Sequence, residues 1–205
     1  MLRVPASSFL RRHVWLIACC ALACASAYAS AGARRHGFSL PAWIWQSSGW
    51  QHRPWTPWTA PLIGLTPFHT FGNLLALAAV GVLGHTVDAR PRETLALLIA
   101  WPLATLGLLF WPAVGWYAGL SGLIHAAAAI VAWRALTQRS VRGIGVLLAA
   151  GLLAKLLLEH GWAVPVGFDS NWGFNVVYAA HLSGALVGLI AAAAVDGAVK
   201  IRLRP

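Results

Sequence analysis

Charged residues are scarce in this sequence. Asp, Glu, Lys and Arg together make up 10% of its 205 residues, whereas 59% are hydrophobic. A soluble globular domain carries about 25% charged residues, so this chain has too little polar surface to cover itself in water. The composition therefore excludes an ordinary soluble protein and indicates that a lipid bilayer is its natural solvent.

Acidic residues and cysteines are also few. Five acidic residues stand against fifteen basic ones, for a net charge of +10. In a soluble protein this excess would suggest nucleic acid as a partner, but membrane topology explains it here, and we expect no nucleic acid. Cys19, Cys20 and Cys24 share one apolar run without metal-binding spacing. We interpret them as small apolar side chains of a helix and expect neither a metal nor a cofactor.

Six hydrophobic runs alternate with polar loops, and a helix needs about 20 apolar residues to cross a bilayer. The pattern predicts an all-α membrane protein, with one domain over residues 1–205 and six transmembrane helices. The predicted spans are residues 13–31, 61–84, 94–111, 121–133, 143–162 and 174–195. A Trp-rich loop, residues 32–60, separates the first two, and we expect it at the membrane interface, where Trp is enriched.

The first span also has the features of a secretory signal: a basic start, an apolar run and the small residues of ASAYASAG. The segment LIAC, ending at Cys19, resembles a lipoprotein signal as well. We expect the span to be retained, because the segments that follow are themselves embedded in the membrane. Cleavage stays open as the alternative.

The basic residues predict the orientation of the chain. With the N-terminus in the cytoplasm, three of the fifteen lie outside (Arg34, Arg35 and Arg53) and Lys155 lies within a span. The other eleven lie on the cytoplasmic side, as the positive-inside rule expects: Arg3, Arg11, Arg12, Arg90, Arg92, Arg134, Arg139, Arg142, Lys200, Arg202 and Arg204. Both termini are then cytoplasmic, which requires an even number of spans.

Three polar side chains fall at a similar predicted depth. Ser121 opens a span of 13 residues, which rises only about 20 Å in a hydrocarbon core of about 30 Å. Ser121 should therefore lie about 10 Å below the outer face. His181 is predicted at the same depth, and His69 about 22 Å above the cytoplasmic end of its span. Polar groups inside a membrane are costly and usually functional.

Ser121 is the predicted nucleophile. It lies in the sequence GLSG, in which Gly119 and Gly122 fit close helix packing equally well. A serine at a helix N-terminus lies near free backbone N–H groups and the positive end of the helix dipole. It still needs a base within hydrogen-bond reach.

His181 is the predicted base. Gly184 and Gly188 lie on nearly the same face of its helix, so that the sixth span can approach a neighbour closely. Contact with the fourth span would bring His181 to Ser121. A buried histidine with a local hydrogen bond is the structural alternative.

The remaining polar residues each fit more than one role. His69 and Asn73 are four residues apart on one helix face and fit either two oxyanion-hole donors or interhelical hydrogen bonding. His125, four residues after Ser121, fits a residue that orients or stacks on His181, and equally a rival base.

Carboxylates are not expected near these residues. Asp88, Glu93 and Asp196 are predicted to be cytoplasmic, and Asp169 lies in an outer loop. Lys155 and Glu159 are spaced to neutralise each other on one helix. The sequence therefore predicts a Ser–His dyad rather than a triad.

These motifs together resemble the rhomboid family of intramembrane serine proteases. The matching pieces are His69-x-x-x-Asn73, GLSG around Ser121 and HLSGALVG from His181, in this order over about residues 50–196. The resemblance implies the six-helix rhomboid fold, with Ser121 as nucleophile and His181 as general base. It also implies an oxyanion hole made by His69, Asn73 and the Ser121 backbone N–H.

A narrower resemblance concerns His125. Its place in GLSGLIHA and the short chain are similar to the rhombosortase subgroup of bacteria, which is thought to process proteins with a C-terminal Gly-Gly sorting tail. This implies a place in the bacterial inner membrane, an active site open to the outer side, and membrane-anchored proteins as substrates. The oligomeric state stays open.

Two other functions fit the same residues. One is a catalytically inactive rhomboid-like protein that binds membrane clients. The other is a small transporter that uses intramembrane histidines as a proton relay, since ionisable groups in a membrane serve all three roles.

Overall fold

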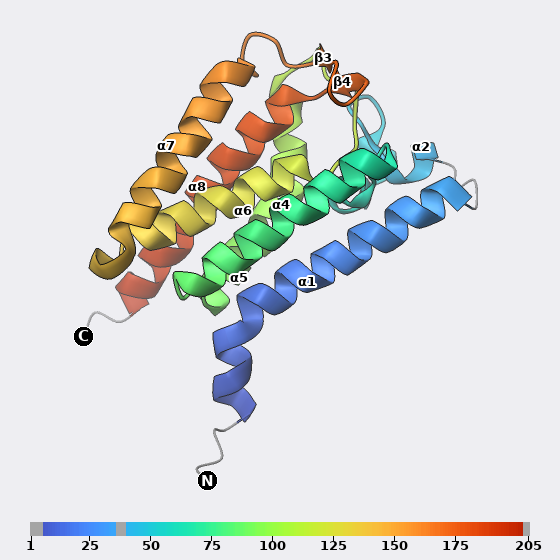
Figure 1. Cartoon of the computed structure of the whole chain (residues 1–205). Coiled ribbons are helices and arrows are strands. Elements are labelled where there is room, and N and C mark those ends of the chain that lie inside the picture. The colour runs from blue at the N-terminus through green and yellow to red at the C-terminus, as the bar shows by residue number, and fades with distance from the viewer. Residues whose placement is uncertain (1–5, 36–39, 203–205) are drawn as a thin grey trace.

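The fold is a bundle of long helices (Figure 1), seen in a computed structural model that describes residues 6–35 and 40–202. The helices are α1 (Ala6–Arg35), α2 (Leu40–Trp43), α3 (Thr56–Thr59), α4 (Pro67–Thr86), α5 (Pro91–Leu106), α6 (Ser121–Leu136), α7 (Arg142–Glu159) and α8 (Tyr178–Arg202). Short strands β1 (Trp45–Gln46) and β2 (Trp116–Tyr117) pair antiparallel, as do β3 (Gly167–Asp169) and β4 (Phe174–Val176). Four short 3-10 helices complete the described part: Trp50–His52, Ala60–Leu62, Gly107–Phe110 and Arg139–Val141.

Five stretches of the described residues are long and apolar enough to cross a membrane: Leu10–Arg34, Pro67–Thr86, Pro91–Phe110, Arg139–Glu159 and Tyr178–Val199. The apolar helix α6 is shorter, with 16 residues, and rises only about 24 Å. The predicted helical, multi-pass membrane architecture is therefore confirmed. The predicted count of six spans depends on α6.

Two predicted spans begin later than expected. Residues 61–66 do not extend α4, because Thr66 caps the helix: its Oγ1 accepts from the backbone N–H of His69 at 3.1 Å. Pro67 then occupies the first helical position, where its missing N–H costs nothing. Likewise α8 starts at Tyr178 rather than 174, since Phe174–Val176 forms a strand instead.

The predicted loop 32–60 is folded rather than extended. α1 continues to Arg35, and β1 in this segment pairs with β2, which precedes α6. Trp45 is fully buried there. Residues 36–39, and the basic residues Arg3 and Arg204 used for the orientation, lie outside the described residues.

α6 lies at the centre of the bundle. Eleven of its residues are buried, as expected for a helix that is apolar all round. α8 packs directly on it: a side chain at Gly184 would overlap the backbone of Gly122, and one at Gly188 the backbone of Ala126. The close approach predicted from the glycine stripe is therefore confirmed.

Ion pairs connect α5, α6 and α8 at the helix ends that lie away from Ser121. Arg92 contacts Asp196 at 3.2 Å and Glu93 at 2.7 Å, and Arg134 lies 3.7 Å from Glu93. The buried Glu93 also accepts from the backbone N–H of Arg90 at 2.8 Å, capping the start of α5. Glu93 lies in the first turn of α5 and Asp196 in the C-terminal half of α8, both remote from Ser121, as the sequence predicted.

Candidate active site

The ends of four helices meet around one cavity. α4, α6 and α8 begin there, and α7 ends there. Ser121 is the first residue of α6, while His69 and His181 lie in the first turns of α4 and α8. Three helix N-termini thus direct the positive ends of their dipoles toward this region. The electrostatic setting favours a negative charge that develops beside Ser121.

Ser121 and His181 are in direct contact. The Ser121 hydroxyl Oγ lies 2.9 Å from His181 Nε2, although the two residues are 60 positions apart. The His181 side chain is buried. The close packing of α6 and α8 at Gly184 holds the two helices at the spacing that this contact requires. The geometry is that of a serine beside a base.

A carboxylate joins this pair, and the prediction that none would is wrong. Glu159 Oε2 lies 2.7 Å from His181 Nδ1, and Glu159 Oε1 lies 2.6 Å from Lys155 Nζ. The predicted Lys155–Glu159 ion pair does form, but it occupies only one carboxylate oxygen. Glu159 ends α7, where His160 takes the left-handed conformation (φ 51°). That helix end lies beside the start of α8, which spacing along α7 alone does not reveal.

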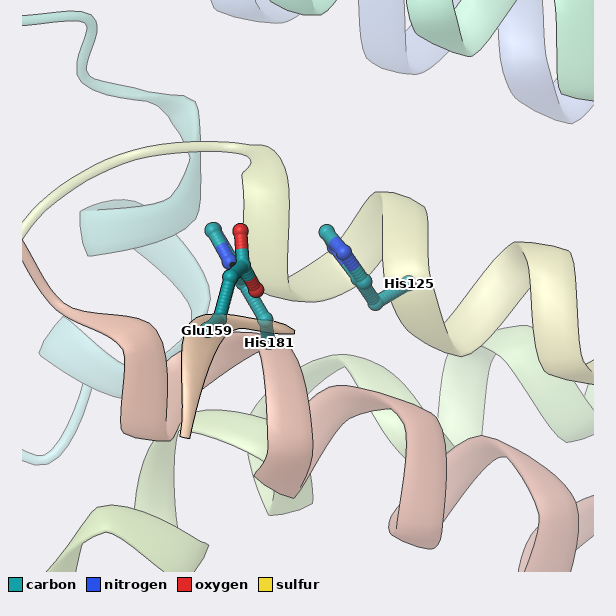
Figure 2. Close-up of side chains that lie close together, drawn as sticks. All are labelled: His125, Glu159 and His181. Atoms are coloured by element: carbon teal, nitrogen blue, oxygen red, sulfur yellow. Dashed lines mark hydrogen bonds and ion pairs between the residues drawn. The ribbon is translucent and has the colours of Figure 1, made fainter. Parts of the chain in front are cut away.

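His125 packs on the face of His181. The ring centroids are 4.2 Å apart and the planes differ by 9°. The Nδ1 of His125 donates to the Ser121 carbonyl oxygen at 2.7 Å, so this nitrogen is engaged by the backbone rather than by the hydroxyl. Figure 2 shows His125 approaching from α6 while Glu159 and His181 lie together. Of the two roles left open by the sequence, the arrangement favours the orientation of His181.

His69 and Asn73, both on α4, line the same cavity. The Asn73 amide Nδ2 donates to His69 Nε2 at 3.0 Å, and both side chains are buried. The second hydrogen of that amide stays available to another acceptor. Gly119, with φ +135°, lies against His69, and a Cβ there would be 3.3 Å from His69 Cε1. His69 and Asn73 thus lie on one face of α4, as predicted, and they are hydrogen-bonded to each other.

The cavity between these side chains has a volume of about 220 Å³. The hairpin β3–β4 covers it and contributes Asp169, Trp172 and Val176. Trp172 and Phe174 contact the edge of the His69 ring at centroid distances of 5.4 and 4.9 Å. The site is therefore a recess roofed by the connection between α7 and α8.

A sequence model of the Rhomboid domain matches residues 51–196. The chain belongs to the rhomboid family. This confirms the resemblance predicted over about residues 50–196. No curated protein matches the chain significantly.

One residue of this rhomboid's site escaped prediction from the sequence altogether. Tyr117, at the end of β2, donates its hydroxyl hydrogen to the carbonyl of Gly119 at 2.5 Å and accepts from the N–H of Gly122 at 3.2 Å. It thereby closes the chain into a tight loop around Ser121. The only signal was an aromatic residue in the Gly-rich connection AVGWYAGL, which has no spacing that would indicate this role.

The histidine cluster of this rhomboid does not suit a metal ion. His125, Glu159 and His181 each offer a ligand atom within 4.8 Å of the others. An imidazole binds a metal through a lone pair in its ring plane, at about 2.0–2.1 Å for zinc. Two rings only 9° from parallel and 4.2 Å apart direct those lone pairs along separate planes. Both nitrogens of His181 are also already engaged.

Proposed function

We propose that this rhomboid is an active serine endopeptidase that cleaves membrane-anchored proteins. The observation that carries the proposal is the 2.9 Å contact between Ser121 Oγ and His181 Nε2 in a cavity at the helix ends. An inactive family member that only binds clients has no use for this contact. Neither does a proton relay, which requires no nucleophile.

The proposed reaction begins with attack of Ser121 Oγ on the scissile carbonyl, as His181 Nε2 takes the hydroxyl proton. The carbonyl π-electrons move to oxygen, and the oxyanion accepts hydrogen bonds from the Asn73 amide and the Ser121 backbone N–H. His69 holds the Asn73 amide in place. The oxyanion electrons then re-form the carbonyl as the scissile C–N bond breaks, and His181 gives its proton to the leaving amine nitrogen. Water, deprotonated by His181, attacks the acyl-enzyme in the same way and releases Ser121.

The proposed topology has six spans, with α6 as a short central one. Eleven buried residues shield α6 from lipid, so a helix below the usual length is tolerated, and Ser121 then lies below the outer surface. The distribution of basic residues supports cytoplasmic termini and a site that opens to the outer side. We place the protein in a bacterial inner membrane, with its retained first span in α1.

Lateral entry of the substrate is supported by a second cavity. It has a volume of about 350 Å³, lies between α4, α6 and α7, and is almost entirely apolar. It shares Ala76, Ile124, His125 and Lys155 with the first cavity. An extended, apolar segment of a membrane anchor could thus reach Ser121 without first entering water.

Filling this second cavity should block long substrates while sparing small ones. In Gly151→Phe, the new ring projects from α7 at a position where no atom lies within 4 Å of the added Cβ. We expect a lower kcat/KM for a membrane-anchored substrate and unchanged labelling of Ser121 by a small fluorophosphonate. Gly143→Phe, equally open but outside the cavity, is the matched control. Equal cleavage by both variants would refute lateral entry at this point.

The substrate class that we favour is a C-terminal Gly-Gly sorting tail. The support is His125, whose place in GLSGLIHA resembles rhombosortases and whose ring stacks on His181. Small residues near a cleavage site suit a recess that is roofed by the aromatic side chain of Trp172. The test is to compare membrane and secreted proteomes with and without active enzyme, searching for shortened C-terminal tails.

Labelling tests the activity itself. Wild-type protein in detergent is expected to react with a fluorophosphonate at Ser121, and Ser121→Ala to lose both the label and substrate cleavage. Ser183→Ala, which removes a buried hydroxyl bonded to the carbonyl of Ala104 at 2.7 Å, should keep the label. Undiminished labelling of Ser121→Ala would exclude the assignment. Client binding without cleavage by the wild type would favour the inactive alternative.

A further inference from the structure

We infer that Glu159, held by Lys155, is a positioning residue for His181, so that this rhomboid works with a Ser121–His181–Glu159 triad rather than a dyad. The inference rests on the proposed protease function. It concerns how the base is oriented and charged, which the family match does not specify.

The three side chains form a continuous series of contacts. Ser121 Oγ lies 2.9 Å from His181 Nε2, and His181 Nδ1 lies 2.7 Å from Glu159 Oε2. The histidine side chain is only 7% exposed and that of Glu159 14%. Little water therefore competes for these hydrogen bonds. The two ring nitrogens of His181 are both occupied, one by the nucleophile and one by the carboxylate.

This series determines which nitrogen carries the proton. In its ion pair with Lys155, Glu159 is a carboxylate, and a carboxylate only accepts hydrogen bonds. His181 must then donate its hydrogen from Nδ1, which leaves the lone pair on Nε2 facing the Ser121 hydroxyl. That is the tautomer in which Nε2 acts as a base. Without Glu159, the opposite tautomer would compete and would present an N–H to Ser121.

The carboxylate also matches the charge that appears during the reaction. When the O–H bond of Ser121 breaks, its proton moves to Nε2, and the ring becomes a cation with a hydrogen on each nitrogen. Glu159 stays unprotonated and faces that cation through Nδ1–H, as the carboxylate does in serine-protease triads. His125 is stacked on the face of the His181 ring and so limits the tilting of that ring out of its plane.

The part assigned to Lys155 is to hold the Glu159 carboxylate, not to take part in the reaction itself. Its Nζ binds Oε1 from one turn earlier on α7, and its side chain is half exposed. With one oxygen held, the carboxylate is directed at His181 through the other. A purely structural reading, in which the pair only tethers α7 to α8, predicts a change in stability and none in the turnover of folded enzyme.

The first test replaces Glu159 by Gln. The rate is measured on a membrane-anchored substrate, with active sites counted by fluorophosphonate titration so that only folded enzyme contributes. We expect kcat to fall by about 10²- to 10⁴-fold, the range that a correctly positioned general base contributes, with KM nearly unchanged. Glu93→Gln is the matched control: it removes the other glutamate of the chain, which is buried and likewise ion-paired, in its case with arginine, but lies far from Ser121. Its kcat per titrated site should equal that of the wild type.

The second test asks whether Lys155 acts through Glu159. Lys155→Met alone should lower kcat by about tenfold, and the same change in a Glu159→Gln background should have no further effect, because contacting residues that act in series are not additive. Equal losses in both backgrounds would show that Lys155 acts independently and would overturn its assigned part.

The outcomes separate this inference from the proposed function. If the wild type is neither labelled nor active, the protease proposal fails first. If the wild type is active and Glu159→Gln keeps its kcat per titrated site, the protease stands and the triad is refuted. A fall in kcat in Glu159→Gln but not in Glu93→Gln supports the triad.

Discussion

Replacing His181 by Ala is expected to lower kcat by about four orders of magnitude or more. Removal of the base from a serine-protease pair costs as much as removal of the nucleophile, because the two act as a unit. Here the Nε2 of His181 is the ring nitrogen that contacts Ser121 Oγ, so no hydroxyl proton can be accepted without it. The measurement is single-turnover cleavage of a membrane-anchored substrate, with retained thermal stability as the check on folding.

The matched variant is His125→Phe. A phenyl ring keeps the stacking on His181 but loses the hydrogen bond to the Ser121 carbonyl. We expect a loss of about tenfold or less, the range of an orienting hydrogen bond. If the larger loss instead followed the change at His125, that residue would be the base and the assignment of His181 would be wrong.

Adding a side chain at Gly184 is expected to destabilise the whole bundle. In Gly184→Val, the first added carbon already overlaps the backbone of Gly122 on α6. Backbone atoms cannot rotate away, so the helices must separate. We expect a loss of about 3 kcal/mol or more in the free energy of unfolding, at the upper end of overpacking effects. The measurement is thermal unfolding in detergent micelles, followed by helical circular dichroism.

The same change should also weaken the active site. Gly122 follows Ser121 directly, so moving α8 away from α6 lengthens the contact between Ser121 and His181. Fluorophosphonate labelling of the folded fraction should therefore slow as well. Gly197→Val on the same helix is the control, since no atom lies within 4 Å of the added carbon. Equal losses of stability in both variants would show that the close approach at Gly184 is unimportant.

The location of the site could be predicted because of the cost of polar groups in lipid. In so apolar a chain, a serine and histidines in long hydrophobic runs need a partner or a function. Helical rise then converted their sequence positions into depths and placed Ser121, His181 and His69 together. The glycines that bring α6 and α8 into contact could also be identified from the sequence, because close packing of backbones requires small residues.

The role of Glu159 could not be predicted in the same way. The spacing of Glu159 from Lys155 was enough to explain its charge by an ion pair within one helix. A carboxylate has two oxygens, however, and the ion pair with Lys155 uses only one of them. Which group meets the second oxygen depends on where α7 ends relative to α8. The start of α4 was mispredicted because Thr66 and Pro67 cap the helix inside an apolar run, and the run itself does not mark the cap.

The sequence by itself determined the solvent, the helical class and the two residues proposed for the chemistry, because hydrophobicity, rise per residue and the cost of buried polar groups act along the chain. Only the tertiary structure decided the partners across helices. It brought Glu159 to His181 from α7, stacked His125 on the same ring, and placed Tyr117 around Ser121. These contacts depend on the positions of helix ends in three dimensions. The periodicity of residues along one helix carries no information about those positions.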